Sequence, residues 1–421
     1  MKRQGDKPVS LVVVGAGNRG YYTYGAFALK HPNMYKVVAV AEPDADKRKK
    51  FARTHDLPEN MVFETWEDIL NKPKFADAVV IATSDDQHVE PAIAFAKAGY
   101  HVLLEKPVAR KPEEFARIYN QTKDCDVIIL VAHVLRYTPF FKKLKDIVDS
   151  GRIGDIKGID HEEHVGYFHF AHSFVRGNWR RSDETAPSIL TKCCHDMDIM
   201  VWLIGSFVDT LTAHGNLLFF TGTNKPKEAS DRCIDCPFEN TCVFSATRIY
   251  LGDNTGWPVN AISVDLSYEG RYRAVKEGPY GRCVFACDND VCDYYAVSMS
   301  FKSGVLGTFT MTGLSAEITR KIRLFGTLGE IEGDFASGKI SVKLYGKTCE
   351  EYIEKGEEGH GGGDEGLLNH FYKVLKGCEE PQTTLSDSLE SHYMAFAVEE
   401  SRLCGGKPVN VTEFRKRYEG S

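Results

Sequence analysis

The sequence predicts an α/β protein that begins with a doubly wound parallel sheet and continues into an α+β domain with a mostly antiparallel sheet. Its 421 residues suffice for two domains or more, at about 150 residues per domain. Short β-branched runs alternate with helical patterns in the first third of the chain. Segments of alternating apolar and polar residues follow. We therefore expect domains at residues 1–134 and 135–421.

The first domain is expected to hold five parallel strands with amphipathic helices between them. Alternation of strand and helix is typical of a parallel sheet that is covered on both faces. In one of these helices Pro91 lies near the start and Gly99 follows the end, which fits the usual helix boundaries. The predicted strands are residues 11–14, 37–41, 78–82, 101–104 and 127–132.

The second domain is expected to combine antiparallel strands with a few longer helices. A plausible hairpin loop at residues 302–304 joins two of the strands. The predicted strands are residues 156–164, 261–267, 296–301, 305–312 and 322–325. The predicted helices are residues 140–150, 189–204, 366–376 and 385–404. Residues 355–365, rich in glycine and acids, are expected to form a mobile loop.

The charge balance excludes a general attraction to nucleic acid or to anionic membranes. Lys and Arg total 52 against 59 Asp and Glu, a net charge of −7. The apolar runs are far shorter than the roughly 20 residues that span a bilayer. The polar N-terminus runs directly into the first strand with no secretory pattern, so we expect a cytoplasmic protein with mostly reduced cysteines. Its partners are expected to be small molecules or copies of itself.

Three glycines directly after the first predicted strand form a Gly-x-Gly-x-x-Gly pattern, which is typical of dinucleotide-binding loops. Gly15 permits a tight turn, Gly17 lets the backbone approach a pyrophosphate, and Gly20 lets the following helix pack on the strand. The helix N-terminus offers N–H groups to the phosphates. We assign Asn18 and Arg19, between the glycines, to the same cofactor site. The alternative is a glycine turn that binds nothing.

An acidic residue at the end of the second strand discriminates between the nicotinamide dinucleotides. Glu42 lies about 20 residues beyond the glycines, where a carboxylate accepts hydrogen bonds from the adenine ribose. It also repels a 2′-phosphate, so the sequence favours NAD over NADP. The basic run at residues 47–50 weakens this preference slightly.

A charged pair follows the strand at residues 101–104, at the carboxyl edge where doubly wound sheets bind ligands. Lys106 there can donate to a substrate hydroxyl, or act as acid and base where desolvation lowers its pKa. The alternative is a surface ion pair with Glu105.

Together with residues 82–88 and 98–102, the Glu105-Lys106-Pro107 segment resembles the Gfo/Idh/MocA family of NAD(P)-dependent sugar and polyol oxidoreductases, over essentially the whole chain. The resemblance implies an N-terminal Rossmann domain and a C-terminal α+β domain with a large open sheet. Since that sheet commonly pairs between subunits, we expect a homo-oligomer, a dimer or a tetramer. The resemblance also implies that Lys106 lies beside the nicotinamide and positions or deprotonates a substrate hydroxyl. The cofactor residues that it implies here are Thr83, His88 and Glu105.

A second family element, Asp-x-x-x-His with a further Asp three residues on, is matched in part. His195 and Asp198 match its last two positions, whereas Thr191 replaces the first carboxylate. Lys192 follows, and this departure resembles a subgroup with Lys-x-Cys-His-Asp. A histidine near a helix N-terminus and beside a lysine tends to be neutral, so His195 can accept the proton of a sugar hydroxyl. The alternative is a histidine satisfied by capping or packing.

Polar and aromatic side chains concentrate just ahead of that helix. Trp179 can stack on a pyranose face, and Asn178 and His172 can bond hydroxyl groups. Arg176, Arg180 or Arg181 can hold a carboxylate or another anionic substituent. The alternative is a basic loop that packs on the acidic rest of the chain or at a subunit interface.

The twelve cysteines include a group with metal-ligand spacing. Cys233 and Cys236 are two residues apart and Cys242 follows in the same loop-like stretch, which suits a structural, tetrahedral zinc. The candidates for the fourth ligand are Cys194, Cys283 and Cys287, of which Cys287 completes our predicted set. The alternative is a group of free buried thiols.

These features predict an oxidoreductase that transfers a hydride between NAD and a hydroxyl carbon of a sugar, sugar acid or cyclitol. Lys106 and His195 are expected to handle the hydroxyl proton, while Lys192 tunes His195 or contacts the substrate. Two alternatives stay open. One is an NAD-dependent glycosidase that works by transient oxidation, elimination and re-reduction, and the departure at Thr191 leaves room for it. The other is a non-catalytic sensor that binds a dinucleotide.

Overall fold

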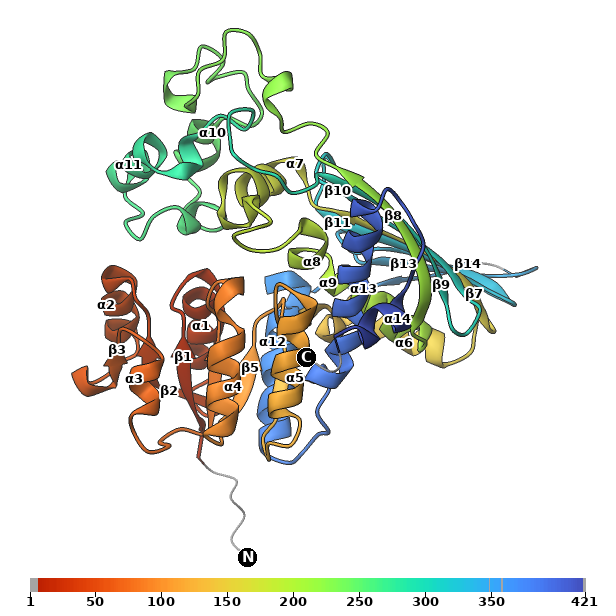
Figure 1. Ribbon diagram of the computed structural model, residues 1–421, viewed down its shortest axis with the longest axis horizontal. Coiled ribbons are helices and arrows are strands. Elements are labelled where there is room, and N and C mark those ends of the chain that lie inside the picture. The colour runs from red at the N-terminus through yellow and green to blue at the C-terminus, as the bar shows by residue number, and fades with distance from the viewer. Residues whose placement is uncertain (1–6, 348, 357–358, 419–421) are drawn as a thin grey trace, which may run out of the picture. The chain divides into compact units, whose positions relative to one another are not determined.

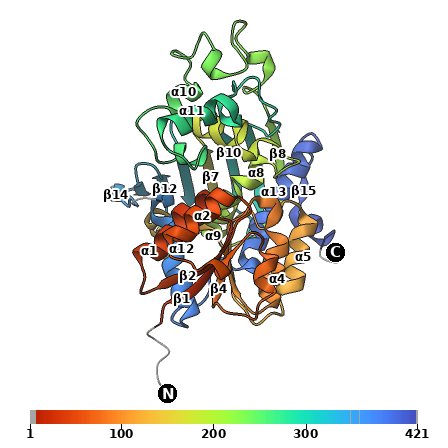
Figure 2. The same ribbon diagram turned by 90° about the vertical axis from the view of Figure 1, so that its left-hand side faces the viewer.

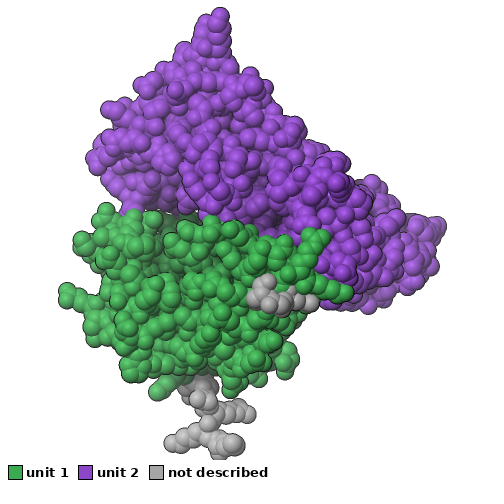
Figure 3. Space-filling model, viewed as in Figure 1, with its two compact units in different colours: residues 1–142, 356–393, 415–421 green, residues 143–355, 394–414 purple. Residues whose placement is uncertain are grey.

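The computed structural model describes residues 7–347, 349–356 and 359–418, which divide into two compact units (Figure 3). Unit 1 takes residues 1–142, 356–393 and 415–421, and unit 2 takes residues 143–355 and 394–414. This division differs from the predicted boundary at residue 134. The difference arises because helix α12 (Gly359–Leu375) and the first part of α13 (Leu385–Leu403) belong to the unit of the N-terminal sheet.

Unit 1 contains the predicted doubly wound sheet. Six parallel strands are ordered β3-β2-β1-β4-β5-β6, and Figure 2 shows β2, β1 and β4 side by side. The strands are β1 (Val9–Val14), β2 (Tyr35–Ala41), β3 (Val62–Phe63), β4 (Ala78–Ile81), β5 (His101–Leu104) and β6 (Ile129–Val131). All four residues of β4 are buried and apolar, as expected of a central parallel strand covered on both faces. The two-residue strand β3 was not predicted, because it is too short to show a periodic pattern.

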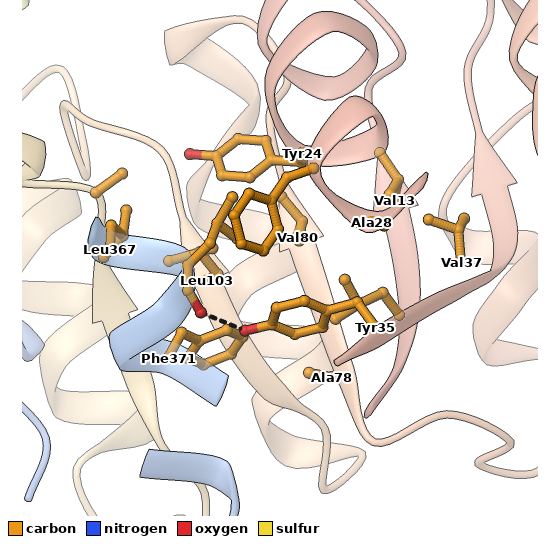
Figure 4. Close-up of a cluster of buried hydrophobic side chains, with 14 of the residues drawn as sticks. Val13, Tyr24, Ala28, Tyr35, Val37, Ala78, Val80, Leu103, Leu367 and Phe371 are labelled. Carbon is orange, nitrogen blue, oxygen red and sulfur yellow. Dashed lines mark hydrogen bonds between the residues drawn. The ribbon is translucent and has the colours of Figure 1, made fainter. Parts of the chain in front are cut away.

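Five helices connect these strands, and α12, from the other end of the chain, also packs on the sheet (Figure 1). The connecting helices are α1 (Ala26–Lys30), α2 (Ala45–Thr54), α3 (Glu67–Leu70), α4 (Val89–Lys97) and α5 (Pro112–Thr122). Helix α12 adds Leu367 and Phe371 to the core beneath β1 and β4 (Figure 4). The hydroxyl of Tyr35 on β2 donates to the carbonyl of Leu368 at 2.7 Å. Burial of α12 against this sheet therefore makes this segment from the C-terminal part of the chain a part of unit 1.

Unit 2 is built on the predicted large open sheet. Its order is β14-β13-β12-β11-β7-β10-β9-β8-β15, and among these described strands β7 and β10 pair in parallel while the other neighbours are antiparallel. The strands are β7 (Ile156–His164), β8 (Val208–Asn216), β9 (Tyr294–Phe301), β10 (Leu306–Thr312), β11 (Thr319–Gly326), β12 (Gly329–Asp334), β13 (Lys339–Leu344), β14 (Cys349–Ile353) and β15 (Val409–Asn410). The predicted α/β fold class with two different sheets is confirmed.

The helices of unit 2 correct one expectation. The helix predicted at residues 189–204 is two helices, α8 (Ser188–Thr191) and α9 (Cys194–Ile204), because the backbone at Cys193 leaves the helical conformation (φ −96°, ψ 4°). This break gives α9 its own N-terminus directly before His195. Helix α6 (Pro139–Asp149) lies where a helix was predicted, α7 (Tyr167–Phe170) follows β7, and α14 (Val411–Lys416) follows β15.

A long insertion between β8 and β9 carries the cysteine-rich segment. It contains α10 (Ala246–Tyr250) and α11 (Tyr268–Glu277) around a small core that includes Val259 and Val275. The strand predicted at residues 261–267 is wrong, because the end of that stretch serves as a helix cap. The Ser267 hydroxyl accepts a hydrogen bond from the Gly270 N–H at 3.1 Å, which starts α11. None of the described helices has an apolar stretch long enough to cross a bilayer.

Candidate active site

The glycine loop after β1 has the geometry that a dinucleotide loop needs. Gly15 has φ +90°, and a Cβ there would lie 2.6 Å from the carbonyl oxygen of Ala82. A Cβ on Gly20 would lie 1.9 Å from the carbonyl oxygen of Gly15. A Cβ on Gly17 would meet nothing within 4 Å. The outer glycines are therefore required by the fold itself, whereas Gly17 keeps open a space that a pyrophosphate can approach.

Glu42, the residue after β2, is held against the glycine loop. It is 6% exposed, and its carboxylate accepts hydrogen bonds from the N–H groups of Ala16 (2.7 Å) and Asp44 (3.0 Å). Each carboxylate oxygen has two lone pairs, so both oxygens keep acceptor capacity for further donors such as ribose hydroxyls. The carboxylate is thus both fixed in position and chemically suited to the predicted adenosine contact.

Arg19 of the glycine loop lies in a buried ionic network. Its Nε is 2.5 Å from Glu105 Oε1, and its Nη2 is 2.8 Å from Asp364 Oδ1. The hydroxyl of Tyr24 donates to the same Glu105 oxygen at 2.6 Å. Burial by itself would raise the pKa of Glu105, but the charges of Arg19 and Lys106 outweigh burial and lower it. Arg19 therefore fastens the glycine loop to β5 and to α12.

The Asp364 contact falls within the segment predicted to be a mobile loop. Residues 357–358 lie outside the described residues, while the chain from Gly359 onward forms the start of α12. His360, Gly361 and Gly362 have φ values of 49°, 64° and 82°, a left-handed run that glycine favours. This run delivers Asp364 to Arg19. The sequence alone offers no partner for the carboxylate, because Arg19 lies 345 residues away.

Lys106 lies at the carboxyl edge of the sheet, as predicted. It is partly exposed, follows β5 directly after Glu105, and precedes Pro107 through a cis peptide bond. The ring of His88 is buried, with Nδ1 2.7 Å from the Pro107 carbonyl oxygen and Nε2 3.2 Å from the Thr83 carbonyl oxygen. Both ring nitrogens of His88 thus contact backbone oxygens. His88 ties the loops after β4 and β5 together and supports the Lys106 segment.

In unit 2 the motif lysine meets a carboxylate that sequence reasoning missed. Lys192 Nζ lies 3.3 Å from Glu163 Oε1, and Arg320 Nη2 lies 2.7 Å from Glu163 Oε2. Glu163 on β7 pairs in register with Arg320 on β11, and the Glu163 side chain is fully buried. A buried carboxylate between two cations is stabilised by both, so the position of the Lys192 ammonium is set by the sheet.

The same network holds the first turn of α9. Asp196 Oδ1 accepts a hydrogen bond from Arg320 Nε at 2.8 Å and lies 2.8 Å from His161 Nε2. Asp196 is fully buried, which would raise its pKa, but Arg320 and then His161 lower the pKa overall. His195 precedes Asp196 and is 5% exposed. Fixing Asp196 on both sides therefore fixes the backbone that carries His195.

A signal for this network was present in the sequence. On β7 the inward-facing positions are Ile159, His161 and Glu163, so the buried face of one strand carries two polar residues. Charged groups on a buried strand face need partners and are concentrated at functional sites. Thr191, in the position of the family carboxylate, is buried and its hydroxyl donates to the Pro187 carbonyl oxygen at 3.4 Å.

The predicted substrate residues do not form one group in unit 2. His172 is buried, with Nδ1 2.8 Å from the Tyr250 hydroxyl, and burial followed by the charge of Arg176 lowers the pKa of His172 to about 3. Arg180 pairs with Asp288 at 3.0 Å. Asn178 is exposed, and Trp179 stacks on Phe174 with ring centroids 6.0 Å apart.

Arg176 and the cysteines come together at a separate place. The fully buried Arg176 lines a cavity in the insertion with four cysteines, Cys233, Cys236, Cys242 and Cys283. Cys287, the predicted fourth metal ligand, does not line this cavity; its thiol contacts the carbonyl oxygen of Cys283 at 3.2 Å. Among the described residues, no three Cys, His, Asp or Glu side chains are arranged to hold a single metal ion.

The doubly wound sheet, the open glycine loop and the fixed Glu42 define a protein of the dinucleotide-binding Rossmann class. Comparison with known families gives the same class and a narrower assignment. The oxidoreductase family with an NAD-binding Rossmann fold matches residues 9–133, and the C-terminal alpha/beta domain of the same family matches residues 145–411. The chain belongs to the Gfo/Idh/MocA family, and the predicted resemblance is confirmed.

Individual relatives have low sequence identity to this chain, but a solved structure can be superposed over almost its whole length. The putative oxidoreductase YteT of Bacillus subtilis is 22% identical over 82% of this chain and 86% of its own. The scyllo-inositol 2-dehydrogenase (NAD(+)) of the same species is 26% identical over 50% of this chain and 58% of its own. Levoglucosan dehydrogenase in complex with NADH and levoglucosan superposes with a TM-score of 0.70 at 18% identity, covering 96% of this chain and 99% of that one.

Proposed function

We propose that this protein oxidises a CH–OH group of a sugar, sugar acid or cyclitol with NAD, or catalyses the reverse reduction. The observation that carries the proposal is the buried network of Lys192, Glu163, Arg320 and Asp196 around the first turn of α9. Buried charges are costly and are kept where they hold reactive groups in place. In this chain, a member of a family of NAD-binding oxidoreductases, the network holds Asp196, the residue next to the histidine that we assign to proton transfer.

NAD rather than NADP is the proposed cofactor. Gly17 leaves room for the pyrophosphate, and Glu42 presents carboxylate oxygens where ribose hydroxyls would donate. The same negative charge disfavours a 2′-phosphate. When bound, NAD supplies the acceptor for the hydride. Hydride transfer needs no metal, so we place the predicted structural zinc outside the reaction.

The chain's own residues handle the proton of the substrate hydroxyl. Lys106 at the carboxyl edge of the first sheet donates a hydrogen bond to that hydroxyl and keeps it oriented. His195 accepts the hydroxyl proton as the carbonyl forms, and returns it in the reverse direction. Lys192 is kept in place by Glu163 and offers an ammonium group to the substrate or to His195.

The substrate class is supported by what the relatives are named for. A scyllo-inositol dehydrogenase and a levoglucosan dehydrogenase act on a cyclitol and on an anhydrosugar. Both substrates are ring compounds with several hydroxyl groups. For contacts with such a ring, our candidate for stacking is Trp179, which is partly exposed. Our candidate for hydroxyl bonding is the exposed Asn178, and for anion contacts it is the partly exposed Arg180.

The assembly and compartment are also proposals. The nine-stranded sheet leaves side chains such as Tyr294 (38% exposed) and Leu306 (65% exposed) uncovered in the single chain. We propose that this sheet pairs between copies of the chain in a cytoplasmic homo-oligomer. Light scattering on a sizing column gives the mass directly, and a strictly monomeric mass would contradict the pairing.

The roles of Lys106 and His195 are tested by separating binding from chemistry. Lys106→Met and His195→Asn are expected to keep NAD binding, measured by protein fluorescence, within about threefold of wild type. Their turnover on any oxidised sugar or cyclitol should fall by about 10²-fold or more, the usual scale of general acid–base catalysis. Lys97→Met and His214→Asn, exposed in the same two units, serve as controls and should keep full activity. Full turnover in Lys106→Met would overturn the assignment.

A further inference from the structure

The cysteine cavity in the insertion is a second site that the oxidoreductase reaction does not use. It has a volume of about 340 Å³. Three of its cysteines come from the segment 233–242, whereas Cys283 comes from the loop that follows α11. All twelve cysteines of the chain are free thiols in the structure. Four cysteines from two separate loops thus line one cavity.

Arg176 shows that the space is suited to negative charge. Its side chain is completely buried, its Nε donates to the Arg282 carbonyl oxygen at 2.7 Å, and one Nη2 bond reaches Cys233 Sγ at 3.4 Å. Its other Nη2 bond goes to the Phe244 carbonyl oxygen at 2.7 Å. A completely buried guanidinium on the cavity wall favours an anionic occupant beside it.

A second cation, Lys225, interacts electrostatically with Cys283 and Cys236, while its ammonium group pairs with Asp231. The remaining wall is largely apolar and includes the rings of Phe238, Phe244 and Phe285, together with one carboxylate, Glu239. Four thiolates around a divalent metal, or around a cluster of the same charge, carry two excess negative charges. The Arg176 guanidinium offsets part of that excess, and the aromatic wall keeps water from the metal–sulfur bonds.

We propose that Cys233, Cys236, Cys242 and Cys283 hold a thiolate-ligated metal centre that organises the insertion. Cys283 takes the place of Cys287 as the fourth ligand, because Cys283 lines the cavity. Four cysteine thiolates can ligate either of two centres, a tetrahedral zinc ion or an iron–sulfur cluster. Among the described residues, no three such side chains converge on one point in this structure, so the two loops draw together around either group, with zinc–sulfur bonds of about 2.3 Å for the smaller one.

Metal analysis of the full-length protein tests the site. We expect protein purified without oxygen to contain either about four iron and four labile sulfide per chain or about one zinc per chain. Broad visible absorption accompanies the cluster and is absent for zinc. Either result supports the four-thiolate centre and identifies its metal. Substoichiometric metal of every kind, also after reconstitution with zinc or with iron and sulfide, would overturn the proposal.

A matched pair of variants assigns the fourth ligand. Cys283→Ser should lose most of the bound metal, while Cys287→Ser, four residues away and outside the cavity wall, should keep the wild-type content. The opposite pattern would return the fourth position to Cys287. NAD binding serves as the check that both variants are folded. For the wild type, removal of the metal by a chelator should lower the thermal midpoint of unfolding, a readout that needs no variant.

Discussion

At the scale of single residues, the candidate site depends on charges that are buried in pairs. Glu163 is fully buried between Lys192 and Arg320, so its removal leaves two cations with too little negative charge. Breaking a buried ion pair by removing one partner costs about 3–5 kcal/mol. A surface pair contributes at most about 1 kcal/mol.

Glu163→Gln should therefore lower the free energy of unfolding by about 3 kcal/mol and reduce turnover at least about tenfold. Urea unfolding and steady-state rates measure the two effects. Glu332→Gln is the matched control, since Glu332 also lies on a strand of this sheet and pairs with Lys343, but its side chain is 49% exposed. A Glu163 variant as stable as the Glu332 variant would contradict the buried network.

His172 makes stability depend on pH in a defined direction. Its pKa is lowered from about 6.5 to about 3, first by burial and then by the charge of Arg176. As the pH falls below about 6.5, the unfolded chain takes up this proton before the folded chain does, so stability is lost toward acid. Above that pH the histidine is neutral in both states and no such loss occurs.

His172→Gln should remove this pH dependence while keeping a partner for the Tyr250 hydroxyl. Between about pH 7.5 and about pH 5, the wild type should lose about 2 kcal/mol more unfolding free energy than the variant. Parallel urea titrations at the two pH values measure the difference. Equal losses in both proteins would show that His172 is protonated without penalty in the folded state.

Site residues could be predicted where they lie at a fixed distance along the sequence from a strand. The glycines, Glu42 and Lys106 are fixed relative to individual strands, so their places could be predicted. Arg19 and Arg176 were assigned to ligands by residue type. In the structure, Arg19 forms ion pairs with Glu105 and Asp364, and Arg176 donates to Cys233 at the cysteine cavity. Long-range partners of this kind have no local pattern.

At the scale of elements, the turn between β1 and the helix after it separates two demands on glycine. Gly20 is required because its Cβ would clash with the Gly15 carbonyl, and a backbone atom cannot move aside cheaply. Gly17 has free space instead. A substitution at Gly20 should therefore damage the fold, whereas a substitution at Gly17 should damage ligand binding.

Gly17→Ala should keep the thermal midpoint of unfolding within about 2 °C and weaken NAD binding at least about tenfold. Gly20→Ala should fail to fold stably. Thermal unfolding and fluorescence titration with NAD give both readouts. Undiminished NAD affinity in Gly17→Ala would contradict the placement of the pyrophosphate at this loop.

The start of α12 is an element whose role depends on Asp364. Burial would raise the pKa of this carboxyl, but Arg19 and then His360 hold it well below its usual range. The ionised form stabilises the fold above the unfolded-state pKa of about 4, and this stabilisation is lost as the pH falls below that value.

Asp364→Asn should lower unfolding free energy at neutral pH by about 2 kcal/mol, with the deficit shrinking below about pH 4, and should weaken NAD binding by releasing Arg19. Glu90→Gln, in an exposed ion pair with Arg117 of α5 in the same unit, is the control. Urea unfolding at several pH values and NAD titration measure the effects. An Asp364 variant indistinguishable from the control would show that α12 does not fasten the glycine loop.

Helices and strands were predicted correctly where a hydrophobic pattern extends over several residues. The prediction failed where a helix cap determines the structure. Helix α13 and the parallel strands were predicted because their burial patterns extend over several residues. The stretch at residues 261–267 alternates like a strand, yet Ser267 caps α11. The break between α8 and α9 was invisible because every residue of the predicted helix is compatible with continuing it.

At the scale of the whole molecule, chain order and structural units differ. A predicted boundary at residue 134 treats the chain as two consecutive blocks, but residues 356–393 return to the unit of the first sheet. Local patterns cannot reveal such a return, since α12 has an ordinary buried face. Family membership, in contrast, was evident from short motifs spread over the chain.

We propose that the molecule is an NAD-dependent oxidoreductase that acts on a sugar, sugar acid or cyclitol. The most direct measurement is an assay in which purified protein and NAD are mixed with free sugars, sugar acids, cyclitols or aryl glycosides. NADH absorbance and aglycone release are followed in the same reaction. We expect NADH to accumulate with at least one free sugar, sugar acid or cyclitol. Aglycone release without NADH would contradict this account and establish a redox-cycling glycosidase.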